Sequence, residues 1–242
     1  MKRLMGLLAL CALVLVPQMA QASSITFDYA LQFSNTTQPG GTAPYLSVNL
    51  NDATAQAGYD VRLTISAIGL VGSEYISEVY FNLDPTLNPT NVLPSAPVQN
   101  PDSAFVTFNH APDGYKADGD GLYDFRVDFN TNAAQRFTAG DVFKIDLNLT
   151  TGTLVAANFN FPSAPDGGSG PFFAAAHLQS IGTNGSGSTW IADGTPGTGD
   201  CPGCSGTPTS DDGGAPVPEP ASLVLMATGL LGMGVLARRR KR

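Results

Sequence analysis

Apolar and polar residues alternate strictly through YDFRVDF, residues 123–129, and again through FKIDLNL, residues 143–149. Successive side chains of a β-strand point to opposite faces, so each segment has one apolar and one polar face. Further segments with the same alternation lie at residues 25–33, 61–66, 78–83 and 104–108. This period predicts half-buried antiparallel strands.

Turn sequences separate these segments, among them PGG at 39–41, PDG at 112–114 and AGD at 139–141. Before the carboxyl-terminal tail, no segment keeps the apolar period of an α-helix. We therefore expect an all-β domain over residues 23–193. The predicted architecture is a two-sheet antiparallel β-sandwich of immunoglobulin-like, cohesin-like or jelly-roll type.

The amino-terminal segment has the pattern of an export signal. Lys2 and Arg3 precede an apolar run over residues 4–16, and the small-residue pattern Ala-Gln-Ala ends at Ala22. We predict a secretory signal peptide over residues 1–22, cleaved between Ala22 and Ser23. Its partners are then the Sec translocon and signal peptidase.

The carboxyl-terminal segment begins with a linker over residues 194–217, which is rich in Gly, Pro, Thr, Ser and Asp and predicted to be flexible. The uncharged apolar run over residues 221–237 would span roughly 26 Å as a helix, enough to cross a hydrocarbon core. A basic cluster closes the chain: Arg238, Arg239, Arg240, Lys241 and Arg242. By the positive-inside rule, we expect this cluster to remain in the cytoplasm. The apolar run would then anchor the precursor in the inner membrane.

The triplet Pro218, Glu219 and Pro220 stands directly before this apolar run. In that order, the triplet, the helix and the basic cluster resemble the PEP-CTERM sorting signal of Gram-negative bacteria that make exopolysaccharide. The resemblance covers residues 218–242. It implies that an exosortase recognises the triplet, that the basic cluster stops transfer, and that the tail is removed. It also implies delivery to the cell surface or extracellular matrix.

The charge of the exported part excludes some partners. The whole chain has a formal net charge of −8, but without its two basic ends it keeps five basic against nineteen acidic residues. A charge of about −14 opposes binding to nucleic acid or anionic lipid. We expect exopolysaccharide or envelope proteins as partners instead.

The loop around residues 118–124 has two interpretations. Asp118, Asp120 and Asp124 stand at positions 1, 3 and 7 of a glycine-bearing loop, a spacing that suits the oxygen ligands of calcium. The loop departs from an EF-hand, since Gly121 is fourth and Phe129 occupies the twelfth position. The alternative is a tight Asp-Gly hairpin turn without metal.

Cysteines and histidines are few. Cys201 and Cys204 lie in a Cys-Pro-Gly-Cys segment, for which we predict a local disulfide in the oxidising envelope; free thiols and a redox role are the alternatives. His110 and His177 are the only histidines, and no serine has the G-x-S-x-G pattern of a hydrolase. We expect both histidines to be structural.

These observations predict a non-enzymatic exported protein with a structural or adhesive role in the exopolysaccharide matrix. The alternative is a calcium-assisted carbohydrate-binding module, with aromatic residues on outward faces at Tyr45, Tyr75, Tyr80 and Phe105. A secreted hydrolase is a third, less supported interpretation, because the catalytic motifs are missing.

Overall fold

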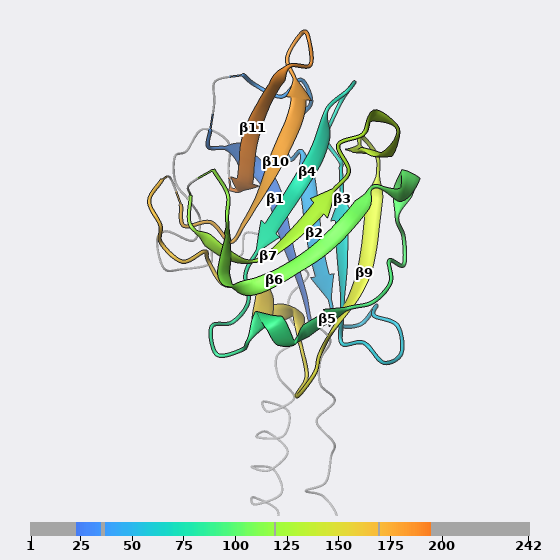
Figure 1. Cartoon of the computed structure of the whole chain (residues 1–242), viewed down its shortest axis with the longest axis vertical. Helices are drawn as coiled ribbons and strands as arrows, with labels where there is room; N and C mark the ends of the chain where they lie inside the picture. The colour runs from blue at the N-terminus through green and yellow to red at the C-terminus, as the bar shows by residue number, and fades with distance from the viewer. Residues whose placement is uncertain (1–22, 35–36, 119, 169, 195–242) are drawn as a thin grey trace, which may run out of the picture. The chain divides into compact units, whose positions relative to one another are not determined.

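The computed structural model describes residues 23–34, 37–118, 120–168 and 170–194. The strands in these ranges are β1 (Ser24–Gln32), β2 (Leu46–Asn51), β3 (Val61–Ser66), β4 (Tyr75–Phe81), β5 (Val92–Pro94), β6 (Phe105–Lys116), β7 (Leu122–Phe129), β8 (Phe137–Thr138), β9 (Val142–Leu149), β10 (Ala174–Ile181) and β11 (Gly187–Asp193). The helical elements described are short 3₁₀ turns: η1 (Pro89–Asn91), η2 (Pro101–Ser103), η3 (Ala133–Gln135) and η4 (Ala156–Phe159). The predicted all-β, antiparallel fold is confirmed (Figure 1).

The structure does not contain the two separate sheets of the predicted sandwich. The strands form one continuous sheet in the order β5-β9-β3-β2-β1-β11-β10-β4-β7-β6, and β8 pairs with β4. The connection runs through β1, which pairs with β2 up to Tyr29 and with β11 from Tyr29 onward. An irregularity between Tyr29 and Leu31 lets this strand pass from one half of the sheet to the other.

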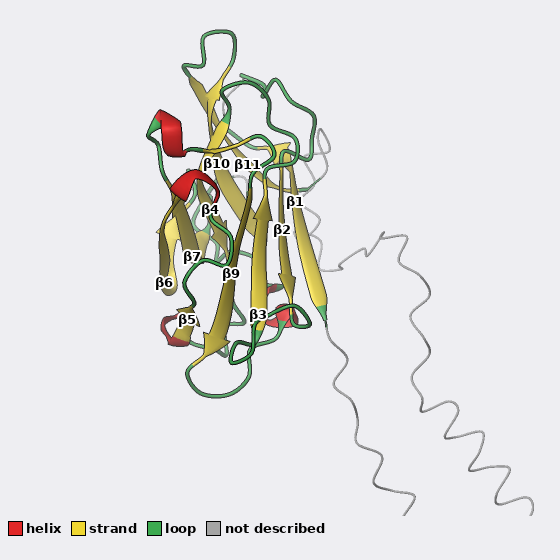
Figure 2. Ribbon diagram, turned by 90° about the vertical axis from the view of Figure 1, so that its right-hand side faces the viewer, coloured by secondary structure: helices red, strands yellow, loops and turns green. Residues whose placement is uncertain are grey.

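The sheet curls so that its two halves face each other. In Figure 2 the half containing β4, β6 and β7 lies opposite the half containing β1, β2, β3 and β9. Apolar side chains of both halves fill the space between, and the rings of Phe105 and Phe143 stack across it at 5.0 Å. The alternation that predicts the strands therefore also separates this core from the outer faces, with Phe125, Val127 and Ile145 fully buried.

A bulge in β4 changes this alternation at one point. Residues 76 and 79 both lie in the core, and the pairing with β10 shifts register between them. Ser77 and Glu78 consequently share the outer side of the sheet, where a regular strand would present only one of them.

Several predicted features lie outside the described residues: the signal peptide with Ala22, the linker from residue 195, Cys201 and Cys204, the triplet at 218–220, the apolar run at 221–237 and the basic cluster at 238–242. Among the described residues, no helix is long and apolar enough to cross a membrane.

Candidate functional site

The outer face of β4, β10 and β11 carries a stacked pair of rings. His177 on β10 lies directly opposite Trp190 on β11. Their rings are nearly parallel, at 10° with centroids 4.5 Å apart. Tyr80 on β4 adds a third ring, tilted and 5.6 Å from Trp190. Trp190 is partly exposed, whereas Tyr80 is only 2% exposed, so the group is open on one side.

Hydrogen bonds fix the orientation of the His177 ring. Its Nδ1 lies 3.1 Å from the Ser77 hydroxyl and 3.3 Å from Gln179 Nε2. Gln179 Nε2 also donates to Ser77, and Gln179 Oε1 accepts from the Tyr75 hydroxyl. Because an amide NH₂ can only donate, Nδ1 is the acceptor of the ring, and the proton of the neutral imidazole lies on Nε2.

Burial and the neighbouring carboxylates act on the pKa of His177 in opposite directions. Burial lowers the pKa of His177, and the carboxylates of Glu78 and Asp118 offset this only in part. Glu78 Oε2 is 3.9 Å from Nδ1 and accepts a hydrogen bond of 3.0 Å from the Tyr80 hydroxyl. Burial and the Glu78 carboxylate raise the pKa of Tyr80, which keeps its hydroxyl protonated as the donor.

A second carboxylate lies next to Glu78 across the strands. Asp128 on β7 is the cross-strand neighbour of Glu78, and its charge is balanced by Arg126, with Nε to Oδ1 at 2.8 Å. Asn109 donates to the other oxygen of Asp128 at 2.8 Å. The guanidinium of Arg126 also lies over the ring of Tyr115, 5.3 Å from its centroid. On this part of the face, the charges of Arg126 and Asp128 therefore balance each other.

Ser77, His177 and Glu78 have the residue types of a hydrolase triad, but their arrangement differs from one. In a triad the serine and the acid contact opposite ring nitrogens, so that a proton passes through the imidazole. Here Ser77 and Glu78 both approach Nδ1. Ser77 is also only 4% exposed, which keeps its hydroxyl away from a substrate.

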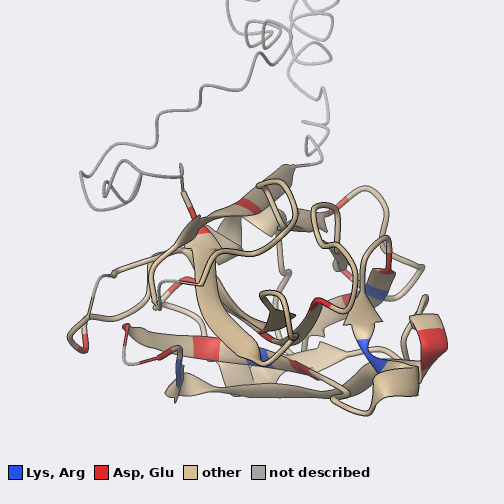
Figure 3. Cartoon of the chain, turned by 90° about the horizontal axis from the view of Figure 1, so that it is seen from above, with Lys and Arg blue, Asp and Glu red and all other residues tan. Residues whose placement is uncertain are grey.

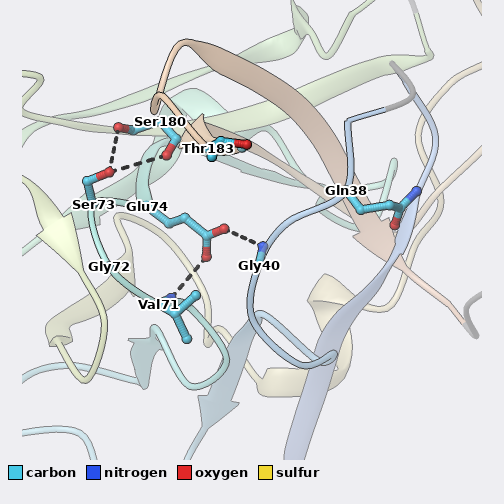
Figure 4. Close-up of a pocket in the computed structure, with 9 residues that line it drawn as sticks. Gln38, Gly40, Val71, Gly72, Ser73, Glu74, Ser180 and Thr183 are labelled. Atoms are coloured by element: carbon cyan, nitrogen blue, oxygen red, sulfur yellow. Dashed lines mark hydrogen bonds between the residues drawn. The ribbon is translucent and has the colours of Figure 1, made fainter.

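A hollow of about 360 Å³ lies beside the end of β10 and the beginning of β4. Its wall is held by Glu74, whose buried carboxylate accepts from the backbone amides of Gly40 at 2.6 Å and Val71 at 2.9 Å (Figure 4). The hydroxyls of Ser73 and Ser180 meet at 3.1 Å. The hollow is thus lined mainly by hydroxyl, amide and glycine groups.

The structure does not bring the three predicted calcium ligands, Asp118, Asp120 and Asp124, together in one cluster. Asp118 is exposed, Asp120 is 4% exposed and accepts from the Gly170 amide, and Asp124 accepts from the amides of Leu83 and Asp113. In the part of the chain that the structure describes, no three His, Cys, Asp or Glu side chains are placed to hold a metal ion. The calcium site stays a sequence prediction.

Asp124 instead lines a second hollow. This hollow of about 420 Å³ is lined by five prolines among other residues, with Asn82 and Asp113 beside Asp124. Burial raises the pKa of Asp124, although two backbone amides stabilise its charged form.

The predicted outward aromatic residues do not form an exposed platform. Tyr45, Tyr75 and Tyr80 are 8%, 5% and 2% exposed, and Phe105 packs against the core. Tyr80 does point outward, but the rings of Tyr123 and Trp190 pack against it. The alternation at residues 78–83 predicts Glu78 on the polar side of its strand together with Tyr80, and the structure places it there. The sequence analysis did not assign Trp190 to this outer face.

The described domain keeps the acidic character expected from the sequence, with acidic residues on many of its strands and loops (Figure 3). Its cations are mostly engaged: Arg62 pairs with Asp146, Lys116 with Asp166 and Arg126 with Asp128. His110, as expected of a structural histidine, has its Nδ1 2.9 Å from the carbonyl oxygen of Pro89.

Comparison with known families finds a PEP-CTERM protein-sorting motif at residues 216–241. The predicted resemblance of the carboxyl-terminal segment is thereby confirmed. No curated protein and no solved structure matches the chain. The motif supports an exported protein that carries a carboxyl-terminal sorting signal and is processed by an exosortase.

Proposed function

We propose that this chain is a non-enzymatic component of the extracellular polysaccharide matrix, in which the β-domain adheres to the polysaccharide. The observation that carries the proposal is the PEP-CTERM motif at residues 216–241, which supports export and sorting. The precursor is held in the inner membrane by the apolar run at 221–237, and tail processing delivers the domain to the cell surface or matrix.

The domain has properties that suit an adhesive role. An acidic surface with paired cations disfavours nucleic acid and anionic lipid as partners. The outer face of β4, β10 and β11 combines aromatic rings with hydrogen-bonding side chains. The approach of Ser77 and Glu78 to one nitrogen of His177 supports a role other than hydrolysis.

Cell fractionation tests the sorting part of the proposal. In cells with an active exosortase, we expect the chain to lose its tail and to be recovered with the exopolysaccharide. Replacing Pro218, Glu219 and Pro220 by alanine should leave the uncleaved chain in the membrane fraction. A control variant changes Asp211 and Asp212 of the linker to asparagine and should behave like the unchanged chain. Normal cleavage of the triplet variant, or an intact tail on the unchanged chain, would contradict the proposal.

A further inference from the structure

We infer that the outer face of β4, β10 and β11, centred on Trp190, His177 and Glu78, binds uncharged sugar residues of a polysaccharide. This inference deepens the proposed function and rests on it. The three side chains come from three neighbouring strands and meet on one side of the sheet. A sugar ring has apolar C–H faces and a rim of hydroxyls, so it needs a flat aromatic surface with donors and acceptors beside it.

The apolar surface is the part of Trp190 and His177 that stays exposed, because the two rings stack 4.5 Å apart and 10° from parallel and so cover one face of each other. Trp190 is partly exposed, and the side chain of His177 is 21% exposed. A partly exposed, parallel pair of rings offers apolar area whose orientation is already fixed.

The donor belongs to the His177 ring, and the acceptor belongs to Glu78 beside it. Nδ1 is occupied by Ser77 and Gln179, so Nε2–H is the ring's available donor, and it has no partner among the described residues. Oε2 of Glu78 accepts a hydrogen bond from the Tyr80 hydroxyl, whereas Oε1 has no hydrogen-bond partner in the same described ranges. The Glu78 side chain is 30% exposed. One donor and one acceptor can thus bind neighbouring sugar hydroxyls.

The groups are held in place before any ligand arrives. Gln179 is fixed by Tyr75, Ser77 by Gln179, and Glu78 by Tyr80. Side chains that are already ordered lose little conformational entropy on binding, which favours affinity.

The charges select an uncharged sugar. Burial lowers the pKa of His177, which favours the uncharged ring, and the adjacent Arg126 is paired with Asp128. An acidic sugar at this face would meet the carboxylates of Glu78 and Asp128, and the neighbouring Arg126 is already paired with Asp128. The hollow at the end of the same two strands is lined by the Glu74 carboxylate, which two backbone amides hydrogen-bond, and its lining residues include no Lys or Arg that would attract an acidic sugar.

Fluorescence titration tests this site, because Trp190 is the only tryptophan of the chain. The probes are oligosaccharides from the hydrolysed exopolysaccharide of the producing cells, separated into an uncharged and a uronic-acid fraction. We expect the uncharged fraction to change the Trp190 emission of the exported chain saturably. His177→Ala and Glu78→Gln should each weaken binding about tenfold, the effect of one lost hydrogen bond.

Thr64→Ala is the matched control, because Thr64 lies on the outer side of β3 in the other half of the sheet. Urea unfolding of each variant shows whether it folds, and Glu78→Gln preserves the shape of its side chain should His177→Ala unfold. Unchanged affinity in folded variants, or binding of the uronic-acid fraction alone, would overturn the inference. If the variants still sediment with intact exopolysaccharide as the unchanged chain does, the site is wrong but the proposed function stands. If the unchanged chain fails to sediment with it, both fail.

Discussion

Asp193 on β11 lies opposite Tyr29 on β1, at the point where β1 changes its partner strand. Both side chains are enclosed: Tyr29 is 0% exposed and Asp193 is 9% exposed. One carboxylate oxygen of Asp193 accepts from the Ala174 amide at 2.9 Å. The crossing between the two halves of the sheet is thus built around a buried acid.

Asp193→Asn should stabilise the domain at neutral pH. Burial raises the pKa of Asp193 to about 6 from 3.8, so the folded state binds this proton more tightly than the unfolded state does. The stabilisation from protonation is complete below about pH 4 and is lost as the pH rises through about 6. The variant mimics the protonated side chain, and we expect it to be up to about 3 kcal/mol more stable at neutral pH. Urea unfolding at pH 7 and pH 4 measures the difference, which should shrink on acidification. A variant that is less stable at pH 7 would contradict the assignment.

Tyr29→Phe should leave the free energy of unfolding unchanged or raise it by about 1 kcal/mol. The Tyr29 hydroxyl is buried without a hydrogen-bond partner in the described structure, and such a group costs free energy on folding. Tyr75→Phe is the comparison, since the buried Tyr75 hydroxyl donates to Gln179 Oε1 at 2.7 Å. Thermal or urea unfolding distinguishes the two. A loss of more than about 1 kcal/mol for Tyr29→Phe would mean that the hydroxyl is bonded in solution.

Arg62→Ala should destabilise the domain by about 3–5 kcal/mol, because it leaves a buried carboxylate without its partner. Arg62 contacts both oxygens of Asp146, at 2.8 and 2.9 Å, and the Asp146 side chain is fully buried. Arg126→Ala is the matched control: its partner Asp128 is more exposed, and the expected cost is about 1 kcal/mol or less. Equal losses in urea unfolding would contradict this difference in burial.

Trp190 emission should report the protonation of His177. The rings are stacked, and a protonated imidazole quenches indole fluorescence. Because burial lowers the pKa of His177, the midpoint should lie below the ordinary value of 6.5. The stability that depends on the neutral ring is present above pH 6.5 and is lost as the pH falls through the folded-state pKa. His177→Gln should abolish the titration. A midpoint above 6.5 would show that the carboxylates outweigh burial.

Removal of calcium should leave thermal unfolding unchanged. The carboxylates of Asp120 and Asp124 accept hydrogen bonds from backbone amides, and they do not converge with Asp118. The measurement is the melting temperature with excess EDTA and with added calcium. A rise on calcium addition that Asp118→Asn removes would instead support the metal site predicted from the sequence.

The strands could be predicted from the sequence because alternation is a local property. The segments at 123–129 and 143–149 form β7 and β9 with the expected apolar side in the core. The single continuous sheet could not be predicted, since it depends on how β1 shares its two ends between β2 and β11. Such pairing joins residues far apart in the chain and leaves no local pattern.

The candidate site was less accessible to sequence analysis. The bulge that turns both Ser77 and Glu78 outward is a register shift in the pairing of β4 with β10, and the sequence of β4 alone does not show it. The burial of Tyr80 likewise depends on Tyr123 and Trp190, which come from other strands. The sorting motif, in contrast, is a contiguous segment and was recognised from its residues alone.

Co-sedimentation of the exported chain with exopolysaccharide from the producing cells tests the central claim of matrix adhesion most directly. Increasing polysaccharide should carry the chain into the pellet saturably, in EDTA as well as in calcium, and the uncharged oligosaccharide fraction should compete. A chain that stays in the supernatant at every polysaccharide concentration would contradict adhesion to the matrix polysaccharide.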